Sequence, residues 1–323
     1  MRKADTTPMS SIICTRNRGR SVLDAVASVL ANTHPNFELV VVDQSTNDET
    51  AKALAEHFSD RRLKYIRSSA VGKGMALTVG MSESTGSVVA LTDDDCVVPP
   101  DWLETFDAIF AKHRKVAVAF CVVEAAEHNP ILGFVPDYIR SDERLSTTAH
   151  DARRILGLGA GMAVRRSIVE RLGGFDTLLG PGSTFPSCDD RDIAIRALLA
   201  GHHVYDTAST RVTHFGFRTW QEGRELTRRN FLAIGAAYSK FLRSGRFELM
   251  YIPVYEFVRF ALWPPIWDLL RLRQPQGMVR ITAFVEGFLG GLRTPMDKAT
   301  MKFIDERASS SAELLKRDTP LSQ

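Results

Sequence analysis

Three consecutive aspartates, Asp93, Asp94 and Asp95, follow a short apolar run at residues 88–91. Such a run predicts a strand buried in a parallel sheet, and ligands bind at the carboxyl ends of strands in such sheets. Adjacent carboxylates repel one another unless a proton or a cation offsets their charge. In extended backbone Asp93 and Asp95 point to the same side, so they are candidate ligands for a divalent cation on phosphate oxygens. The alternative is a solvated acidic turn before the next helix.

A second acidic cluster opens a predicted helix after the Gly/Pro/Ser-rich loop 180–188. Its carboxylates are Asp189, Asp190 and Asp192, and acids near a helix N-terminus are stabilised by the helix dipole. The dipole does not explain why a flexible loop delivers them, so this cluster is also a candidate site. His214, at the end of the strand-like run 209–213, is a third candidate, although a lone histidine is more often structural.

The composition is that of a globular protein, with 44% apolar and 24% charged residues in a chain of 323. This length suits one large α/β domain with an extension, or two small domains. The formal charge of +3 is unevenly distributed, because residues 218–293 contain 12 Lys/Arg against 6 Asp/Glu. A basic, aromatic-rich segment suits an anionic membrane surface or an anionic substrate, and a solvated helical face is the alternative. No nucleic-acid-binding module is recognisable, so we expect no nucleic acid partner.

The four cysteines, Cys14, Cys96, Cys121 and Cys188, are widely spaced. This spacing argues against a zinc site or a disulfide framework and favours a reducing compartment. Residues 1–5 are followed by no apolar stretch, so we expect no signal peptide. The sequence therefore predicts a cytoplasmic protein.

Strand and helix patterns alternate through the first half of the chain. Strands are predicted at residues 10–14, 37–42 and 63–67, and amphipathic helices at 21–30 and 49–58. This alternation is typical of a doubly wound α/β fold, in which the carboxyl end of each strand delivers a polar loop to one rim.

Three segments in this order carry a family resemblance. They are residues 11–18 (SIICTRNR), 28–33 (SVLANT) and 38–45 (ELVVVDQS). Together they resemble the opening of family 2 glycosyltransferases of the GT-A fold. The resemblance implies a nucleotide-sugar donor, with a UDP-sugar favoured, and makes Thr15, Arg16 and Asp43 candidate contacts for the nucleotide. A turn or helix-capping aspartate is the alternative for Asp43.

The stretch 72–80 (GKGMALTVG) resembles a Gly-Lys-x-x-Ala-Leu-Asn-x-Gly pattern that lies near the donor diphosphate in this family. Thr78 stands where asparagine is usual, whereas Lys73 remains a suitable phosphate partner. The acidic triplet falls where the family has its Asp-x-Asp motif. The resemblance therefore implies that Asp93 and Asp95 bind Mn2+ or Mg2+, and that Asp94 contacts the nucleotide-sugar donor.

The cluster that begins at Asp189 resembles the family's Glu-Asp-x-Asp element, whose second acid is the catalytic base. This correspondence makes Asp190 the base, with Asp189 in place of the usual glutamate. A base is required because the acceptor hydroxyl loses its proton as it attacks the sugar. A histidine at the position of His214 can complete the metal site in this fold class, and a histidine ligand favours Mn2+ over Ca2+.

The last third of the chain has a different character. A helix is predicted at residues 220–241, with residues 235–237 small enough for close packing. An aromatic-rich segment follows at 248–267, and a second apolar piece with small residues at 284–292. No apolar run approaches the roughly 20 residues needed to cross a bilayer. Residues 248–292 could lie on a membrane surface, or form a helical layer or an oligomer contact. We expect the tail, 308–323, to be disordered.

Taken together, these patterns predict a GT-A-like α/β fold, a mostly parallel sheet flanked by helices, with a C-terminal helical extension. The expected parts are a nucleotide-sugar-binding half (1–125), an acceptor half (126–217), the extension (218–307) and the tail (308–323). The expected activity is metal-dependent, inverting sugar transfer to a hydroxyl of a glycan or lipid-linked acceptor, at the inner face of the cell membrane. The alternatives are a sugar nucleotidyltransferase and an inactive membrane-peripheral binding protein of this fold.

Overall fold

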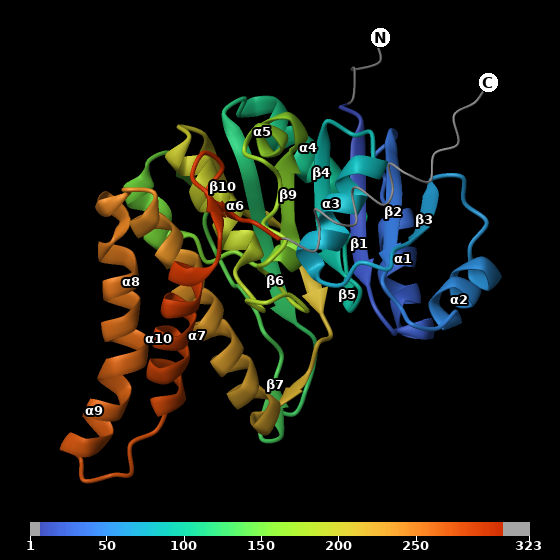
Figure 1. The fold of residues 1–323 in the computed structure, drawn as a ribbon. Coiled ribbons are helices and arrows are strands. Elements are labelled where there is room, and N and C mark those ends of the chain that lie inside the picture. Colours follow the sequence, from blue (N-terminus) through green and yellow to red (C-terminus); the bar gives the residue numbers. More distant parts are fainter. Residues whose placement is uncertain (1–6, 306–323) are drawn as a thin grey trace, which may run out of the picture.

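The computed structural model describes residues 7–305, which fold around a nine-stranded sheet with helices on both faces (Figure 1). The first half of the chain alternates strands and helices, as the apolar periodicity predicts. Its elements are β1 (Met9–Thr15), a 3-10 turn η1 (Gly19–Val22), α1 (Leu23–Leu30), β2 (Phe37–Asp43), α2 (Glu49–His57), β3 (Leu63–Arg67), α3 (Lys73–Glu83) and β4 (Val88–Asp93).

The second half of the sheet contains both strand directions. Its elements are β5 (Cys96–Val97), α4 (Trp102–Lys112), β6 (Val116–Ala125), β7 (Gly133–Phe134), β8 (Arg144–Ser146), the 3-10 turns η2 (Ala149–Arg154) and η3 (Gly159–Gly161), β9 (Met162–Arg165), α5 (Arg166–Arg171), α6 (Asp189–Leu199), β10 (His203–His214) and β11 (Arg218–Thr219). The strand order is β3-β2-β1-β4-β9-β6-β10-β5, with β8 also paired to β10. Strands β9, β5 and β8 run antiparallel to their neighbours, and the remaining pairs in this sheet are parallel.

Alternate residues of the central strands enter two different cores. Ile12, Val40 and Val42 pack with α3, α5 and α6 on one face, whereas Ile13 and Val41 pack with α1 and α4 on the other. Successive side chains of a strand point to opposite faces, so a sheet covered on both faces needs continuous apolar strands. This requirement explains why β1, β2 and β4 read as apolar runs rather than as alternating ones.

One short pairing joins the acidic triplet to the distant end of β10. Strand β5 begins directly after Asp95 and pairs antiparallel with β10, so that Cys96 lies opposite His214 and Val97 opposite Thr213. The N–H of Phe215 also donates to the carbonyl of Asp95 at 2.8 Å. The fold thus places His214 beside the carboxyl end of β4.

The extension forms a helical layer that packs beside β10 and α6. It comprises α7 (Trp220–Arg243), η4 (Phe247–Leu249), α8 (Tyr251–Glu256), a π-helix (Phe257–Leu262), α9 (Trp263–Leu270), α10 (Met278–Arg293) and a small hairpin of β12 (Met296–Asp297) and β13 (Lys302–Phe303). Helices α7 and α10 approach closely, because a Cβ on Gly235 would lie 2.2 Å from the carbonyl oxygen of Phe284. Over residues 7–305, no helix combines the length and apolar character that a membrane span requires.

The predicted α/β architecture, with a mostly parallel sheet flanked by helices and a helical extension, is confirmed. One continuous sheet crosses the expected boundary at residue 125, because β6 pairs with both β9 and β10, so the division into two halves remains a prediction. Between β6 and η3 the chain contains only short strands and turns. The predicted disorder of 308–323 concerns residues outside the described range.

Candidate functional site

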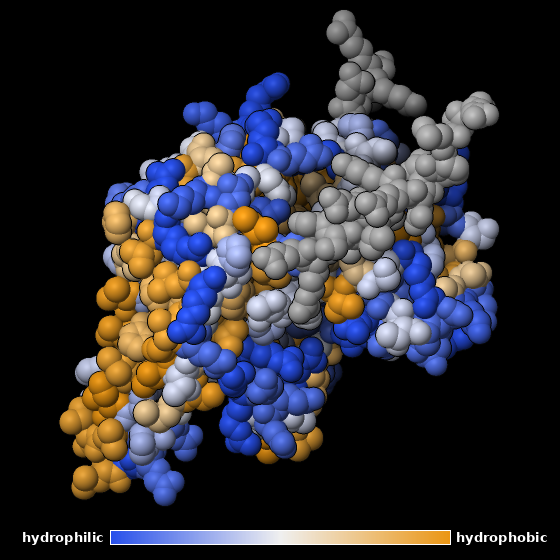
Figure 2. Space-filling model, viewed as in Figure 1, coloured by the Kyte–Doolittle hydropathy of each residue, from blue (hydrophilic) through white to orange (hydrophobic). Residues whose placement is uncertain are grey.

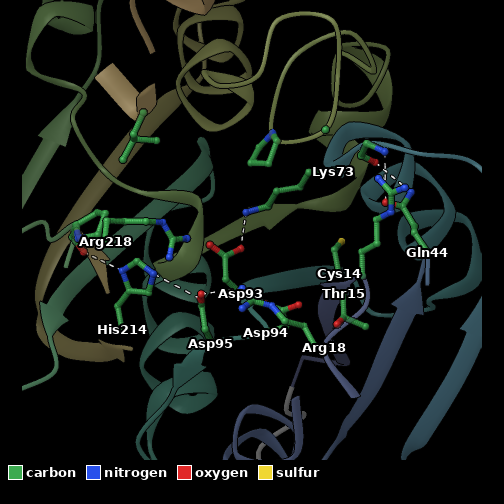
Figure 3. A pocket seen from close by; sticks show the side chains of 16 residues that line it. Cys14, Thr15, Arg18, Gln44, Lys73, Asp93, Asp94, Asp95, His214 and Arg218 are labelled. Atoms are coloured by element: carbon green, nitrogen blue, oxygen red, sulfur yellow. Dashed lines mark hydrogen bonds and ion pairs between the residues drawn. The ribbon is translucent and has the colours of Figure 1, made fainter. Parts of the chain in front are cut away.

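A pocket of about 450 Å³ opens at the carboxyl ends of β1, β2 and β4 (Figure 3). It lies where a doubly wound sheet binds its ligands. The lining combines acidic, basic and backbone groups from both halves of the sheet and from the extension: Cys14, Thr15, Arg16, Arg18, Gln44, Gly72, Lys73, Asp93, Asp94, Asp95, Pro136, Pro181, Gly182, His214, Arg218 and Leu226. Four cationic side chains facing three carboxylates suit a ligand that carries phosphate together with a cation.

Arg18 holds two members of the acidic triplet. Its Nη2 lies 3.0 Å from Asp94 Oδ1 and 2.9 Å from Asp95 Oδ2. Burial raises the pKa of Asp94 above its ordinary value, against the opposing charge of Arg18. Burial would also raise the pKa of Asp95, but the His214 hydrogen bond and the charges of His214 and Arg18 lower it to about 2. Asp95 is therefore ionised at neutral pH.

The ring of His214 is fixed by a backbone carbonyl and faces Asp95. Its Nδ1 lies 2.8 Å from the carbonyl oxygen of Pro136 and must donate to it, so Nε2 is the ring nitrogen that faces Asp95. Nε2 lies 3.5 Å from Asp95 Oδ1 (Figure 3). A Cβ on Gly216 would lie 2.3 Å from Nε2, so glycine keeps the space beside this nitrogen open. Asp95 and His214 thus fit a divalent cation that accepts oxygen and nitrogen ligands.

Cys96 completes a group whose ligand atoms, with those of Asp95 and His214, all lie within 4.8 Å of one another. Burial raises the pKa of its thiol far above the ordinary value, and the charges of Asp93 and Asp95 raise it further. Cys96 also packs in the apolar core on this face of the sheet. We therefore assign Cys96 to the core that supports the site and take Asp95 and His214 as the candidate ligands.

Asp93 has a different partner in this structure. Its carboxylate forms an ion pair with the Nζ of Lys73, at the start of α3 (Figure 3). Burial lowers the pKa of Lys73, but the charges of Asp93 and Asp189 outweigh it and raise the pKa above its ordinary value. Lys73 is therefore a permanent cation inside the pocket. The role of Asp93 as a metal ligand stays a prediction.

Asp190 lies at the start of α6, beside the end of Lys73. Its Oδ2 accepts from the N–H of Gly159 at 2.8 Å, and its Oδ1 accepts from the N–H of Arg191 at 2.7 Å. A Cβ on Gly159 would lie 3.5 Å from both Asp190 Oδ2 and Lys73 Nζ, so the three residues converge. Burial raises the pKa of Asp190, and burial also raises the pKa of Asp189 to about 7. A carboxylate with a raised pKa is a stronger base.

The residues predicted to contact the nucleotide divide into two groups. Thr15 and Gln44 line the pocket (Figure 3). Arg16 also lines it. Asp43, in contrast, is fully buried: its Oδ1 accepts from the N–H and the hydroxyl of Ser45, and its Oδ2 accepts from the Tyr65 hydroxyl at 2.8 Å. In this structure Asp43 shapes the loop after β2. Its contact with a nucleotide base stays a prediction.

The sequence interpretation missed three polar pocket residues, Arg18, Gln44 and Arg218. Arg18 and Gln44 are close to predicted residues, and their loop positions after β1 and β2 were the available signal. Arg218 follows β10 and comes from the segment that we expected to be an extension. Leu226 of α7 lines the same pocket, so the extension forms part of this site.

Comparison with known proteins adds a sequence family and a fold. The sequence model of Glycosyl transferase family 2 matches residues 10–173, about half of the chain. A relative from Haloferax volcanii, a glucosyl-dolichyl phosphate glucuronosyltransferase, is 29% identical over 226 residues, which cover 65% of this chain and 71% of the relative. The matches to the next two curated relatives cover only 16% of their lengths.

Two solved structures share the fold over most of the chain. The mannosyltransferase PcManGT from Pyrobaculum calidifontis, in complex with GDP-Man and Mn2+, has a TM-score of 0.59 at 17% identity, covering 98% of this chain and 82% of that one. Residues 1–349 of TarS from S. aureus, in complex with UDP-GlcNAc, have a TM-score of 0.57 at 16% identity, covering 87% and 81%. At these identities the likeness shows the fold alone.

Proposed function

The chain belongs to glycosyl transferase family 2 and is a glycosyltransferase with the GT-A fold. We propose that it moves a sugar from a nucleoside-diphosphate sugar to a hydroxyl acceptor. The observation that carries the proposal is the convergence of Lys73, Asp190 and the Asp95–His214 pair at one rim of the sheet. This rim offers cations for a diphosphate and a carboxylate base beside them.

The proposed reaction is a single displacement. Asp190 accepts the proton of the acceptor hydroxyl through a carboxylate oxygen, while the acceptor oxygen forms a bond to the anomeric carbon. The bond from that carbon to the diphosphate oxygen breaks, and the nucleoside diphosphate leaves with the electron pair. Lys73 and Arg218 line the pocket as cationic partners for the diphosphate. Attack from the face opposite the leaving group inverts the anomeric configuration.

Asp95 and His214, with Asp93, would hold Mn2+ or Mg2+ when the donor binds. The cation then supplies positive charge that offsets the departing diphosphate. The Mn2+ bound in the complex of PcManGT supports this proposal. Thr15, Arg16 and Gln44 are the proposed contacts of the nucleotide, and Asp94 the proposed contact of the donor through Arg18.

Product stereochemistry tests the displacement mechanism. We expect the anomeric configuration of the product to be opposite to that of the donor sugar, as read from its proton NMR coupling constant. Retention of configuration would contradict direct attack and the role of Asp190.

A UDP-sugar remains the favoured donor, and the GDP-Man bound by PcManGT makes GDP-sugars the second group to test.

We further propose that the chain acts at the inner face of a membrane on a lipid-linked or glycan acceptor. Large apolar side chains are exposed along α8, the π-helix and α9: Tyr251, Val254, Tyr255, Val258, Phe260, Trp263, Ile266, Trp267, Leu269 and Leu270. These helices form a hydrophobic area on the molecular surface (Figure 2). The exposed Arg259 lies in the π-helix, and the exposed Arg271 and Arg273 directly follow α9. Aromatic and basic residues together suit an anionic interface. The dolichyl phosphate named for the Haloferax relative supports a lipid-linked acceptor.

Leu270→Ser is expected to weaken binding to phosphatidylglycerol vesicles by about tenfold, because a buried leucine side chain contributes about 1.5 kcal/mol or more. Leu270 is 67% exposed, so its replacement leaves the fold intact. Vesicle co-sedimentation measures the change. The matched control is Leu132→Ser, since Leu132 is 62% exposed in the loop before β7, outside this face. Equal binding of the two variants would contradict the assignment of this surface.

A further inference from the structure

Arg191 connects the proposed catalytic base to the helical extension. Its backbone N–H donates to Asp190 Oδ1 at 2.7 Å. Its guanidinium Nη2 lies 2.6 Å from Glu256 Oε1, and both side chains are largely buried, at 15% and 9% exposed. One residue is therefore fixed at both ends, by the base on one side and by the last residue of α8 on the other.

Tyr238 of α7 completes this contact. Its hydroxyl donates to Glu256 Oε1 at 3.0 Å, and its ring faces the Arg191 guanidinium, with 5.7 Å between the ring centroid and Cζ. Arg191, Glu256 and Tyr238, which we call the anchor triad, join α6, α8 and α7. The cavity beside Arg191 and Tyr238 is only about 10 Å³, so the packing leaves Arg191 little room to move.

A second set of buried charges also holds α6, at Asp192 in its first turn and at Arg196 one turn later. The Nζ of Lys240 lies 2.8 Å from Asp176 Oδ2 and 2.5 Å from Asp192 Oδ1, while Asp192 Oδ2 accepts from Arg196 at 2.8 Å. These four side chains have no exposed surface. Asp192 and Arg196 are thus held without the anchor triad, and the triad adds a separate contact at Arg191, the residue directly after Asp190.

The backbone directly before the first turn of α6 is irregular. Cys188, directly before α6, has φ of 71°, in the left-handed region that a residue with a side chain seldom adopts. Such a conformation is strained and persists only where the surroundings impose it. A π-helix begins directly after Glu256, and π-helical segments are frequent at functional sites. Both ends of the Arg191–Glu256 contact therefore adjoin irregular backbone.

We propose that Glu256 and Tyr238 are positioning residues for the transfer reaction: through Arg191 they fix the first turn of α6 and so place the carboxylate of Asp190. This inference rests on the proposed function, since it takes Asp190 as the base. It assigns the extension a part in catalysis, distinct from its proposed contact with a membrane. Glu256 is buried on α8, whereas its neighbours Val254 and Tyr255 are exposed.

Glu256→Gln is the first test, because it keeps the shape of the side chain and an acceptor for Tyr238 but removes the charge that faces Arg191. We expect kcat to fall on the order of 10- to 100-fold, as for an active group displaced by about 1 Å. KM for the donor is expected to stay unchanged. The assay follows release of UDP or GDP from UDP-glucose, UDP-N-acetylglucosamine and GDP-mannose, with water as the acceptor.

The matched control is Glu286→Gln, the same substitution in an exposed ion pair with Arg228, 3.0 Å apart between α10 and α7. This control is expected to keep the wild-type kcat. Tyr238→Phe removes one hydroxyl only and is expected to lower kcat by several-fold. It decides the question if Glu256→Gln does not fold.

Amide hydrogen exchange gives a readout that needs no substrate. Peptides covering residues 187–193 are expected to exchange faster in Glu256→Gln than in Glu286→Gln, with the rest of α6 unchanged. Wild-type kcat and wild-type exchange in both Glu256→Gln and Tyr238→Phe would overturn the inference. If Asp190→Asn also keeps full turnover, the proposed function fails as well; if Asp190→Asn is inactive, only the positioning role fails.

Discussion

Asp190→Asn is expected to lower sugar transfer by about 10²- to 10⁴-fold while nucleotide binding is retained. Asparagine keeps the size of the side chain and its oxygen can still accept from the N–H of Gly159, which lies 2.8 Å from Asp190 Oδ2. It cannot accept the proton of the acceptor hydroxyl. The measurement pairs steady-state release of nucleoside diphosphate with thermal stabilisation by the same nucleotide.

Asp189→Asn is the control for this change, because Asp189 is the adjacent acid and is also buried. Its raised pKa, about 7, results first from burial and is increased by the charge of Asp190. Since Asp189 is then partly uncharged at neutral pH, we expect a smaller loss from its replacement. Turnover at the wild-type rate in the Asp190→Asn variant would remove Asp190 as the base.

Asp95→Asn is expected to weaken Mn2+ binding by about 10- to 100-fold and to abolish metal-dependent nucleotide binding. The physical reason is the pairing of Asp95 Oδ1 with His214 Nε2 at 3.5 Å, beside the space that Gly216 leaves open. A neutral amide is a weaker ligand for a hard cation than a carboxylate. Isothermal titration of Mn2+ into the nucleotide-free protein measures the change directly.

Asp94→Asn tests whether the effect is specific to position 95. Asp94 has the same neighbour, Arg18, with a separation of 3.0 Å from Oδ1, but lies outside the group formed by Asp95, Cys96 and His214. We expect the Mn2+ affinity of the Asp94→Asn variant to stay within a few-fold of that of the wild-type protein. Equal losses in the two variants would mean that overall negative charge, rather than the Asp95–His214 geometry, determines binding.

Local sequence patterns predicted the sheet and its rim because they depend on residues close in the chain. The apolar runs that form β1, β2 and β4 end in polar loops, and parallel strands bring those loops together. His214 is a different case. Its proximity to Asp95 depends on the two-residue strand β5 and its pairing with β10, a contact between positions more than 100 residues apart. The strand-end position marked His214 only as a lone histidine, and the family resemblance linked it to a metal site.

The remaining site residues could not be predicted because tertiary packing determines their roles. Asp43 has the expected position at the end of β2, yet Ser45 and Tyr65 occupy its carboxylate oxygens. Glu256 interrupts an aromatic-rich segment and reads as a break in a surface helix, whereas the structure buries it against Arg191. No periodicity within one segment reveals a partner so far away in the chain.

The most direct test of the central claim is the thermal stability of the wild-type protein with UDP, GDP, dTDP and CDP, each with and without Mn2+. A nucleotide at one hundred times its Kd stabilises the folded protein by about 2.7 kcal/mol. We predict that one nucleotide, UDP first, gives such a shift only when Mn2+ is present. Stabilisation by none of the four, or an equal shift without metal, would contradict a metal-dependent nucleotide-sugar site.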